Sequence, residues 1–151
     1  MSLLTIDIGG TSIKYARFAD GKLGEEGAFG TPDNLDQFYQ SLTAVVEQFK
    51  ENSDVCGVAI SSPGAVNKAT GVIEGASALP YIHDFDIHAE LEKRFGLPVS
   101  IENDANCAAL SEVKFGAAKG LSDVLLLVLG TGVGGSVVMN GKVHHGKHLF
   151  G

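Results

Sequence analysis

The chain has 151 residues, of which 44% are hydrophobic and 19% charged, a composition typical of a globular domain with a substantial core. Its net charge of −7 argues against a nucleic-acid-binding surface, which usually carries a basic patch. The sequence lacks an apolar run long enough to span a membrane and lacks the basic and apolar regions of a signal peptide, so we expect a cytoplasmic protein.

The first third of the chain predicts three strands and a helix. Strands are expected at residues 4–8, 12–18 and 22–29, with Asp20-Gly21 as a hairpin turn in which both positions tolerate positive φ. Thr31 as N-cap and Pro32 as the first helical residue predict where the helix begins. Its buried face is predicted from apolar residues at helical spacing: Leu35, Phe38, Leu42, Val45, Val46 and Phe49.

The rest of the chain alternates strands with helices. We predict strands at 55–61, near 72–73, at 98–102, 124–129 and 136–139, and helices at 86–95, stopped by Gly96, and from Asn103-Asp104 to about residue 115. The order βββαβαβα, followed by two more strands, predicts an α/β fold with a mixed sheet and helices on its faces. Cys56 and Cys107 lie in apolar stretches, which predicts two core thiols in a reducing compartment.

One short sequence motif occurs twice in the chain. Gly10-Thr11 and Asp20-Gly21-Lys22 recur as Gly130-Thr131 and Asn140-Gly141-Lys142, each at an offset of 120 residues. Coincidence is one explanation, since 20 residues are glycine, but the matched turn favours duplication. We therefore predict a first lobe at residues 1–120 and the first hairpin of a second lobe at 121–151, so that the chain is the first half of something about twice as long.

Both repeats place a glycine-rich loop after an apolar strand. In residues 7–14, glycine backbone amides can approach phosphate oxygens, and Asp7 can hold Mg²⁺ through water. A plain Gly-Gly hairpin is an alternative explanation of the same residues. Residues 130–135 contain five glycines or threonines in six positions, which favours phosphate binding over a structural turn.

Three further segments are open to two interpretations. Asp104 follows a strand and is placed as a general base, yet Asn103 and Asp104 are also good N-caps, and both roles fit if Asn103 caps the helix. Residues 61–64 end another strand, where a Pro-Gly turn is the simpler explanation. Histidines 144, 145 and 148 form either a metal site or, as we favour, a solvated turn.

Together these motifs resemble the ROK family of sugar kinases and related repressors, in the actin-like, ribonuclease-H-like ATPase superfamily. The resemblance rests on residues 7–11 with Lys14, 62–64, 102–108, and 130–135 with Asn140-Gly141, which span nearly the whole chain in the family's order. It implies a ribonuclease-H-like lobe followed by the start of a duplicated one. It also implies an enzyme that transfers the γ-phosphate of ATP to a hydroxyl of a hexose or hexosamine.

The resemblance assigns roles residue by residue. Asp104 matches the catalytic base, and the sugar-contacting positions correspond to Gly64, Ser77, Asn103 and Asp104. The positions for ATP and Mg²⁺ correspond to Asp7, Gly9, Gly10, Thr11, Lys14, Gly130, Thr131 and Gly132, with Asp7 as the metal-binding residue. The expected partners are a sugar and ATP, without nucleic acid or membrane, and a homodimer fits the family.

Several parts of the family pattern belong after position 151. These are the Glu-x-Gly-His segment, the adenine pocket and the cysteine-rich motif, so a structural zinc is expected only in that half, and the isolated fragment is expected to be inactive. Two alternatives to a kinase stay open: a sugar-sensing regulator of the same family and a non-catalytic sugar-binding module. The short stretch before Asp7 leaves no room for a DNA-binding domain there, which disfavours the regulator.

Overall fold

A computed structural model describes residues 1–52, 54–129, 133–147 and 149. The chain divides into two compact units, residues 1–101 and 102–151, and each is described by itself. The boundary that we predicted at residue 120 concerns the repeats of a duplicated fold rather than compactness, and it stays a prediction.

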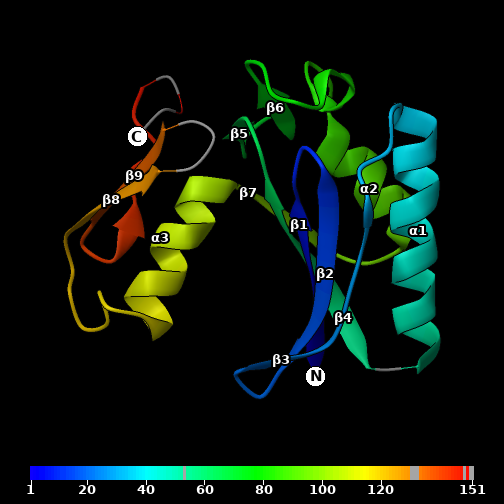
Figure 1. Ribbon diagram of the computed structural model, residues 1–151, viewed down its shortest axis with the longest axis horizontal. Coiled ribbons are helices and arrows are strands. Elements are labelled where there is room, and N and C mark those ends of the chain that lie inside the picture. Colours follow the sequence, from blue (N-terminus) through cyan, green and yellow to red (C-terminus); the bar gives the residue numbers. More distant parts are fainter. Residues whose placement is uncertain (53, 130–132, 148, 150–151) are drawn as a thin grey trace. The chain divides into compact units, whose positions relative to one another are not determined.

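The first unit is built on a five-stranded mixed sheet in the order β3-β2-β1-β4-β7 (Figure 1). Its strands are β1 (Ser2–Ile8), β2 (Ser12–Ala19), β3 (Lys22–Gly30), β4 (Val55–Ser62) and β7 (Val99–Asn103). Strand β1 runs antiparallel to β2 and parallel to β4, which confirms the mixed sheet predicted from the element order. Asp20 and Gly21 have φ values of 52° and 77°, as the predicted hairpin turn requires.

Two helices share the hydrophobic core with this sheet, α1 (Leu35–Asn52) and α2 (Ile87–Phe95). Strand β1 contributes Leu4, Ile6 and Ile8, which alternate along the strand and so share one face. The predicted apolar stripe of α1 is buried except for Leu35, which is only partly buried. Helix α2 contributes Leu91 and Phe95, and it contacts α1, where the Arg94 guanidinium lies 4.0 Å from the Tyr39 ring centroid.

The helix ends confirm one sequence prediction and correct another. Helix α2 is capped by Asp86, whose side chain accepts from the Ala89 amide, and it stops at Gly96 in the left-handed conformation. Helix α1, however, begins at Leu35, and the Asn34 side chain accepts from the Gln37 amide. The predicted start at Thr31-Pro32 was wrong because Thr31 is bound to the loop after β1.

Between β4 and α2 the chain forms a small irregular region. Strands β5 (Ala65–Asn67) and β6 (Val72–Glu74) pair as a separate hairpin, and η1 (Pro80–Ile82) is a single 3₁₀ turn. The sequence predicted a strand near residues 72–73 but not β5, which at three residues has no detectable alternation.

The second unit consists of α3 (Asp104–Phe115) against a three-stranded antiparallel sheet in the order β10-β9-β8. The strands are β8 (Val124–Leu129), β9 (Val133–Met139) and β10 (Lys142–Val143). Asn140 and Gly141, between β9 and β10, have φ values of 51° and 72°, close to those of Asp20 and Gly21. The two copies of the motif thus form the same backbone turn, which supports duplication.

One apolar face of this sheet lies open. Leu125, Leu127 and Leu129 alternate along β8 and are 63–79% exposed. These side chains contribute little to the stability of the hairpin, because burial of apolar side chains is the main source of stability.

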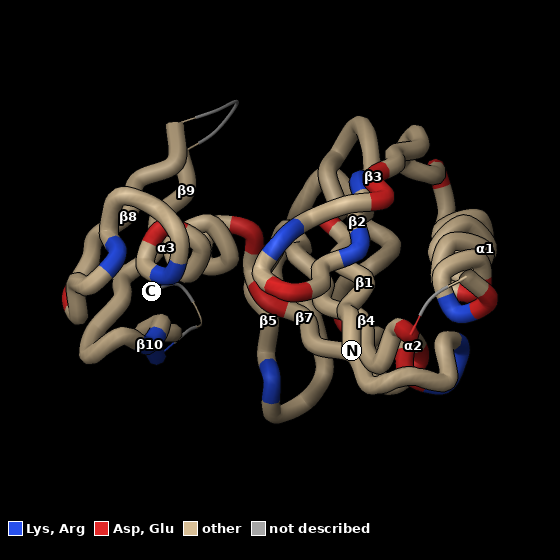
Figure 2. Tube along the Cα trace, turned by 90° about the horizontal axis from the view of Figure 1, so that it is seen from below, with Lys and Arg blue, Asp and Glu red and all other residues tan. Residues whose placement is uncertain are grey.

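The surface and the cysteines complete the description. In Figure 2, Lys and Arg residues are scattered among acidic residues in each unit, and over the whole chain the 18 acidic residues outnumber the 11 Lys and Arg residues. Cys56 is exposed and Cys107 is partly buried, so the prediction of two core thiols was wrong for Cys56, whose sulfur contacts the Ser2 carbonyl oxygen. Among the described residues, no helix combines the length and hydropathy that crossing a bilayer demands.

Candidate active site

The first glycine loop joins β1 to β2 and is held by Thr31. The Gly9 amide donates to the Ser12 carbonyl oxygen at 3.1 Å, which closes the turn. The Thr31 hydroxyl donates to the Gly9 carbonyl oxygen at 2.6 Å, and the Thr31 amide donates to the Thr11 carbonyl oxygen at 3.0 Å. These bonds fix the loop conformation without occupying the amides at its tip.

Those tip amides are open to a ligand. Gly10 and Thr11 are both exposed, and within the described part of the chain neither amide donates a hydrogen bond. Consecutive unpaired amides on a fixed loop form an anion-binding concavity of the kind that holds phosphate oxygens. The loop therefore fits the phosphate-binding part of the prediction.

Asp7 lies at the end of β1, next to this loop. Its Oδ1 accepts from the Ser61 hydroxyl on β4 at 2.8 Å, and in the sheet register it stands opposite Lys14. Its carboxylate is exposed, and Oδ2 has no hydrogen-bond partner among the described residues. Mg²⁺ usually keeps several waters and takes one or two carboxylates together with phosphates, so Asp7 fits a magnesium site beside the loop.

Two glycines allow three segments of the first unit to meet. A Cβ on Gly10 would lie 2.9 Å from the Ala78 Cβ, so the loop packs directly on the segment that follows β6. Gly64 has φ of 97°, and a Cβ there would lie 2.6 Å from Ile73 Cγ2 and 2.9 Å from His83 Cε1. The glycine loop, the Pro63-Gly64 turn and residues 77–83 thus form one cluster, and most side chains are excluded at positions 10 and 64.

Ser77, predicted as a sugar-contacting residue, lies within this cluster and is partly buried. Its hydroxyl oxygen lies 2.7 Å from His83 Nε2 and accepts from the Leu79 amide at 3.2 Å. Below it, the Tyr81 hydroxyl donates to the Pro32 carbonyl oxygen, and burial raises the pKa of Tyr81, so the phenol stays a donor at neutral pH. This bond joins the Ser77 segment to the residues that hold the glycine loop.

Asn103 and Asp104 lie at the start of helix α3, and the two roles predicted for them, helix cap and general base, fall on different residues. The Asn103 side-chain oxygen accepts from the amides of Ala105 and Asn106 at 3.0 and 3.2 Å, which makes Asn103 the N-cap of α3. Asp104 is exposed; its Oδ1 accepts from the Ala105 amide at 2.8 Å, and its Oδ2 has no partner among the described residues. Asp104 therefore keeps a carboxylate oxygen available to a ligand while its neighbour starts the helix.

Beneath this helix start lies a buried polar network that the sequence did not reveal. Glu102, only 8% exposed, accepts from the Asn106 side-chain amide at 3.0 Å and contacts His145 Nε2 at 3.1 Å. Asn106 in turn accepts from the Ser136 hydroxyl at 2.6 Å. The prediction of a solvated turn was therefore wrong for His145, which binds Glu102, whereas His144 is exposed and His148 lies outside the described residues. Among the described residues, no cluster of potential metal ligands is found.

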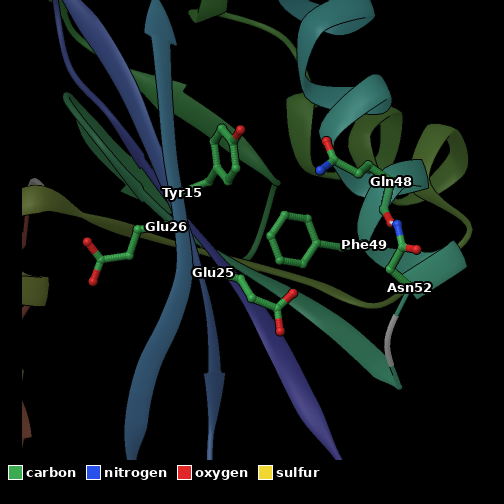
Figure 3. A pocket seen from close by; sticks show the side chains of 6 residues that line it. All are labelled: Tyr15, Glu25, Glu26, Gln48, Phe49 and Asn52. Carbon is green, nitrogen blue, oxygen red and sulfur yellow. The ribbon is translucent and has the colours of Figure 1, made fainter.

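Three of the predicted site residues have no described position. Gly130, Thr131 and Gly132 of the second glycine loop lie outside the described residues. A cavity of about 360 Å³ lies between β2, β3 and α1 and is shown in Figure 3. It is lined by Tyr15, Glu25, Glu26, Gln48, Phe49 and Asn52, none of which the sequence singled out as a site residue.

Comparison with known proteins identifies the group to which this chain belongs. The pattern of the ROK family matches residues 3–151. This chain is a member of the ROK family. It is 37% identical over 150 residues to a beta-glucoside kinase of Listeria innocua, and this match covers 97% of the chain and 49% of the relative.

Two solved ROK structures share its fold. The structure of a ROK family protein from Streptococcus pneumoniae TIGR4 in complex with sucrose is 45% identical, with a TM-score of 0.86 over all of this chain and 50% of the other. A ROK family glucokinase from Streptomyces griseus in complex with glucose and AMPPNP is 32% identical, with a TM-score of 0.87 over 99% of this chain and 48% of the other. The chain thus spans about half the length of the relatives it matches.

Proposed function

We propose that the protein containing this chain is a cytoplasmic, ATP-dependent sugar kinase, to which the chain contributes the N-terminal half. The observation that carries this proposal is the pairing of an available carboxylate oxygen on Asp104 with a helix cap on Asn103. A base for phosphoryl transfer needs a carboxylate that is not consumed by structural bonds, and Asp104 meets this need. The names of the ROK kinases to which the chain is similar support the same activity.

In this proposal Asp104 accepts the proton of the attacking sugar hydroxyl. Gly64, Ser77 and Asn103 contact the sugar and orient that hydroxyl, which replaces a bimolecular encounter with a positioned one. The Gly10 and Thr11 amides receive phosphate oxygens, and Lys14 adds positive charge on the strand beside them. ATP supplies the transferred phosphoryl group, and Mg²⁺ held through Asp7 neutralises its charge.

The remaining assignments are predictions. Gly130, Thr131 and Gly132 are proposed to bind the nucleotide from the second glycine loop, and a structural zinc is proposed only for the C-terminal half. We also propose a homodimer without affinity for nucleic acid. Which sugar is the substrate is left to the experiment.

The proposal is tested by ADP release from the full-length protein with a panel of hexoses, N-acetylhexosamines and β-glucosides. Sugar-dependent ADP release with at least one of them supports the kinase and names its substrate. If no sugar stimulates release by a folded protein, but one binds in calorimetry, the protein is a sugar-binding module or sensor and the proposal is overturned.

Replacing Gly10 by valine is expected to weaken ATP binding by about tenfold, the equivalent of roughly one lost charge-assisted hydrogen bond. The new side chain meets Ala78, because even a Cβ would lie 2.9 Å from the Ala78 Cβ, and the loop must shift its tip amides. Titration with a fluorescent ATP analogue measures the change. Gly24→Val is the matched control, since nothing lies within 4 Å of a Cβ there; equal affinities for the two variants would contradict phosphate binding by this loop.

A further inference from the structure

The bond between Ser77 and His83 has a direction that follows from a third group. His83 is buried, and its two ring nitrogens each contact one oxygen: Nδ1 lies 3.1 Å from the Ile73 carbonyl oxygen and Nε2 lies 2.7 Å from Ser77 Oγ. A carbonyl oxygen only accepts, so Nδ1 carries the proton. In the neutral imidazole Nε2 is then the acceptor, and the Ser77 hydroxyl donates to it.

This arrangement leaves Ser77 with one vacant hydrogen-bonding position. A serine hydroxyl has one donor and two lone pairs. The Ser77 hydroxyl hydrogen is donated to His83 Nε2, and one lone pair of the hydroxyl oxygen accepts from the Leu79 amide at 3.2 Å. The remaining lone pair can only accept, so Ser77 offers an acceptor, and never a donor, to a bound molecule.

The position of Ser77 places this lone pair among the residues of the candidate site. Ser77 precedes Ala78, which packs on Gly10 of the glycine loop, and His83 packs on Gly64. Both neighbours are glycines whose replacement by a larger residue would push the Ser77 segment away. The side chain is itself only partly buried and so can be reached by a ligand.

A serine–histidine pair can also generate a nucleophile, but this one lacks a necessary part. Nucleophilic serines rely on an imidazolium that a carboxylate stabilises. Among the described residues, neither nitrogen of His83 contacts a carboxylate, and behind the ring lies the neutral Ile73 carbonyl. Proton transfer would leave an uncompensated buried charge, which is strongly unfavourable. The pair is suited to orienting a hydroxyl rather than to deprotonating it.

We propose that His83 is a positioning residue that fixes the Ser77 hydroxyl as an acceptor, so that the substrate must present a donating hydroxyl to it. This inference rests on the proposed sugar kinase activity and adds a specificity rule to it. A sugar whose hydroxyl at that position is removed, methylated or replaced by fluorine loses the bond, because none of these groups donates.

The test uses the full-length protein and its best sugar, with a series of analogues in which one hydroxyl at a time is replaced by fluorine. In the wild type, one position is expected to lower kcat/KM by about tenfold through loss of the bond to Ser77. In Ser77→Ala the same analogue should be discriminated by less than about twofold, because the acceptor is gone from the protein side. This comparison identifies the hydroxyl that Ser77 reads.

The role of His83 is tested by two variants that differ in hydrogen-bonding capacity. His83→Leu frees the Ser77 hydroxyl hydrogen to turn toward the sugar, so the fluorine penalty at that position should fall below about threefold. His83→Gln offers one donor to Ile73 and one acceptor to Ser77, so it should restore the wild-type penalty. His88→Leu is the matched control, since His88 contacts the Val99 carbonyl oxygen at 2.8 Å and Glu92 Oε1 at 3.8 Å, neither of which belongs to the candidate site, and the pattern should stay unchanged.

Each result decides between defined outcomes. A penalty that is lost in His83→Leu and retained in His83→Gln supports the inference, and if His83→Leu does not fold, His83→Gln and Ser77→Ala still test it. A second outcome is that the wild type phosphorylates sugars while no fluorinated analogue has a loss of kcat/KM that depends on Ser77 or His83. That result overturns the inference and leaves the proposed function standing. Phosphate on Ser77 in mass spectra after turnover also overturns it, because the serine would then be a nucleophile. A wild type that neither binds nor phosphorylates any sugar overturns the proposed function and the inference together.

Discussion

Asp104→Asn is expected to lower turnover by about a hundredfold or more while the fold and sugar binding persist. The amide cannot accept the proton of the attacking hydroxyl, but its oxygen can still accept from the Ala105 amide, as Asp104 Oδ1 does at 2.8 Å. Asn103 continues to cap α3 through the Ala105 and Asn106 amides. Steady-state kinetics of the full-length protein should therefore show a reduced kcat with little change in KM for the sugar.

A matched control separates catalysis from helix stability. Asp86 is also a carboxylate at a helix start, where it accepts from the Ala89 amide at 2.9 Å, and it has no proposed part in the chemistry. Asp86→Asn should change kcat by less than about twofold, as expected for a substitution that keeps the cap. Unchanged turnover in Asp104→Asn would remove Asp104 from the role of base, and an equal loss in both variants would point to helix stability instead.

The sequence predicted best those features that are encoded locally. The Asp20-Gly21 turn and the Gly96 stop of α2 depend on residues that tolerate positive φ, and these positions do have positive φ. The duplicated turn at Asn140-Gly141 was legible for the same reason. Strand β1 and the stripe of α1 were found because their apolar periodicity matches their geometry.

The features that the sequence concealed depend on contacts between distant residues. Thr31 is a residue type that often caps helices, but its hydroxyl binds the carbonyl oxygen of Gly9, which lies 22 positions earlier. Helix-capping preferences consider only hydrogen bonds to nearby backbone groups, so they could not predict this distant bond. His145 looked like a surface histidine until the fold brought it to Glu102, 43 positions away. Ser77 and His83 are close in sequence, but an irregular segment joins them, and no periodicity indicates that their side chains meet.

Asn106→Ala is expected to destabilise the second unit by about 2–4 kcal/mol, because it removes two bonds from a buried network. Asn106 donates to the buried Glu102 carboxylate and accepts from the Ser136 hydroxyl, which is 1% exposed. Without Asn106, the Ser136 hydroxyl loses its acceptor, and Glu102 loses a donor that offsets the cost of its buried charge. Urea denaturation followed by circular dichroism measures the change in the free energy of unfolding.

The magnitude separates this network from an ordinary helix substitution. Asn52→Ala also removes an asparagine side chain from a helix, but that side chain bonds the Gln48 carbonyl oxygen at an exposed position, so its change should stay within about 0.5 kcal/mol. The double variant Asn106→Ala/Ser136→Ala should lose less free energy of unfolding than the sum of the two single losses. The reason is that Asn106→Ala already leaves the Ser136 hydroxyl unpaired, so that removing this hydroxyl costs little more. Additive losses, or a loss no larger than that of Asn52→Ala, would contradict the bond between them. The network joins the first turn of α3, which carries Asn106, to Glu102 before the helix and to Ser136 on β9, so a confirmed coupling would show that these bonds stabilise the start of the helix.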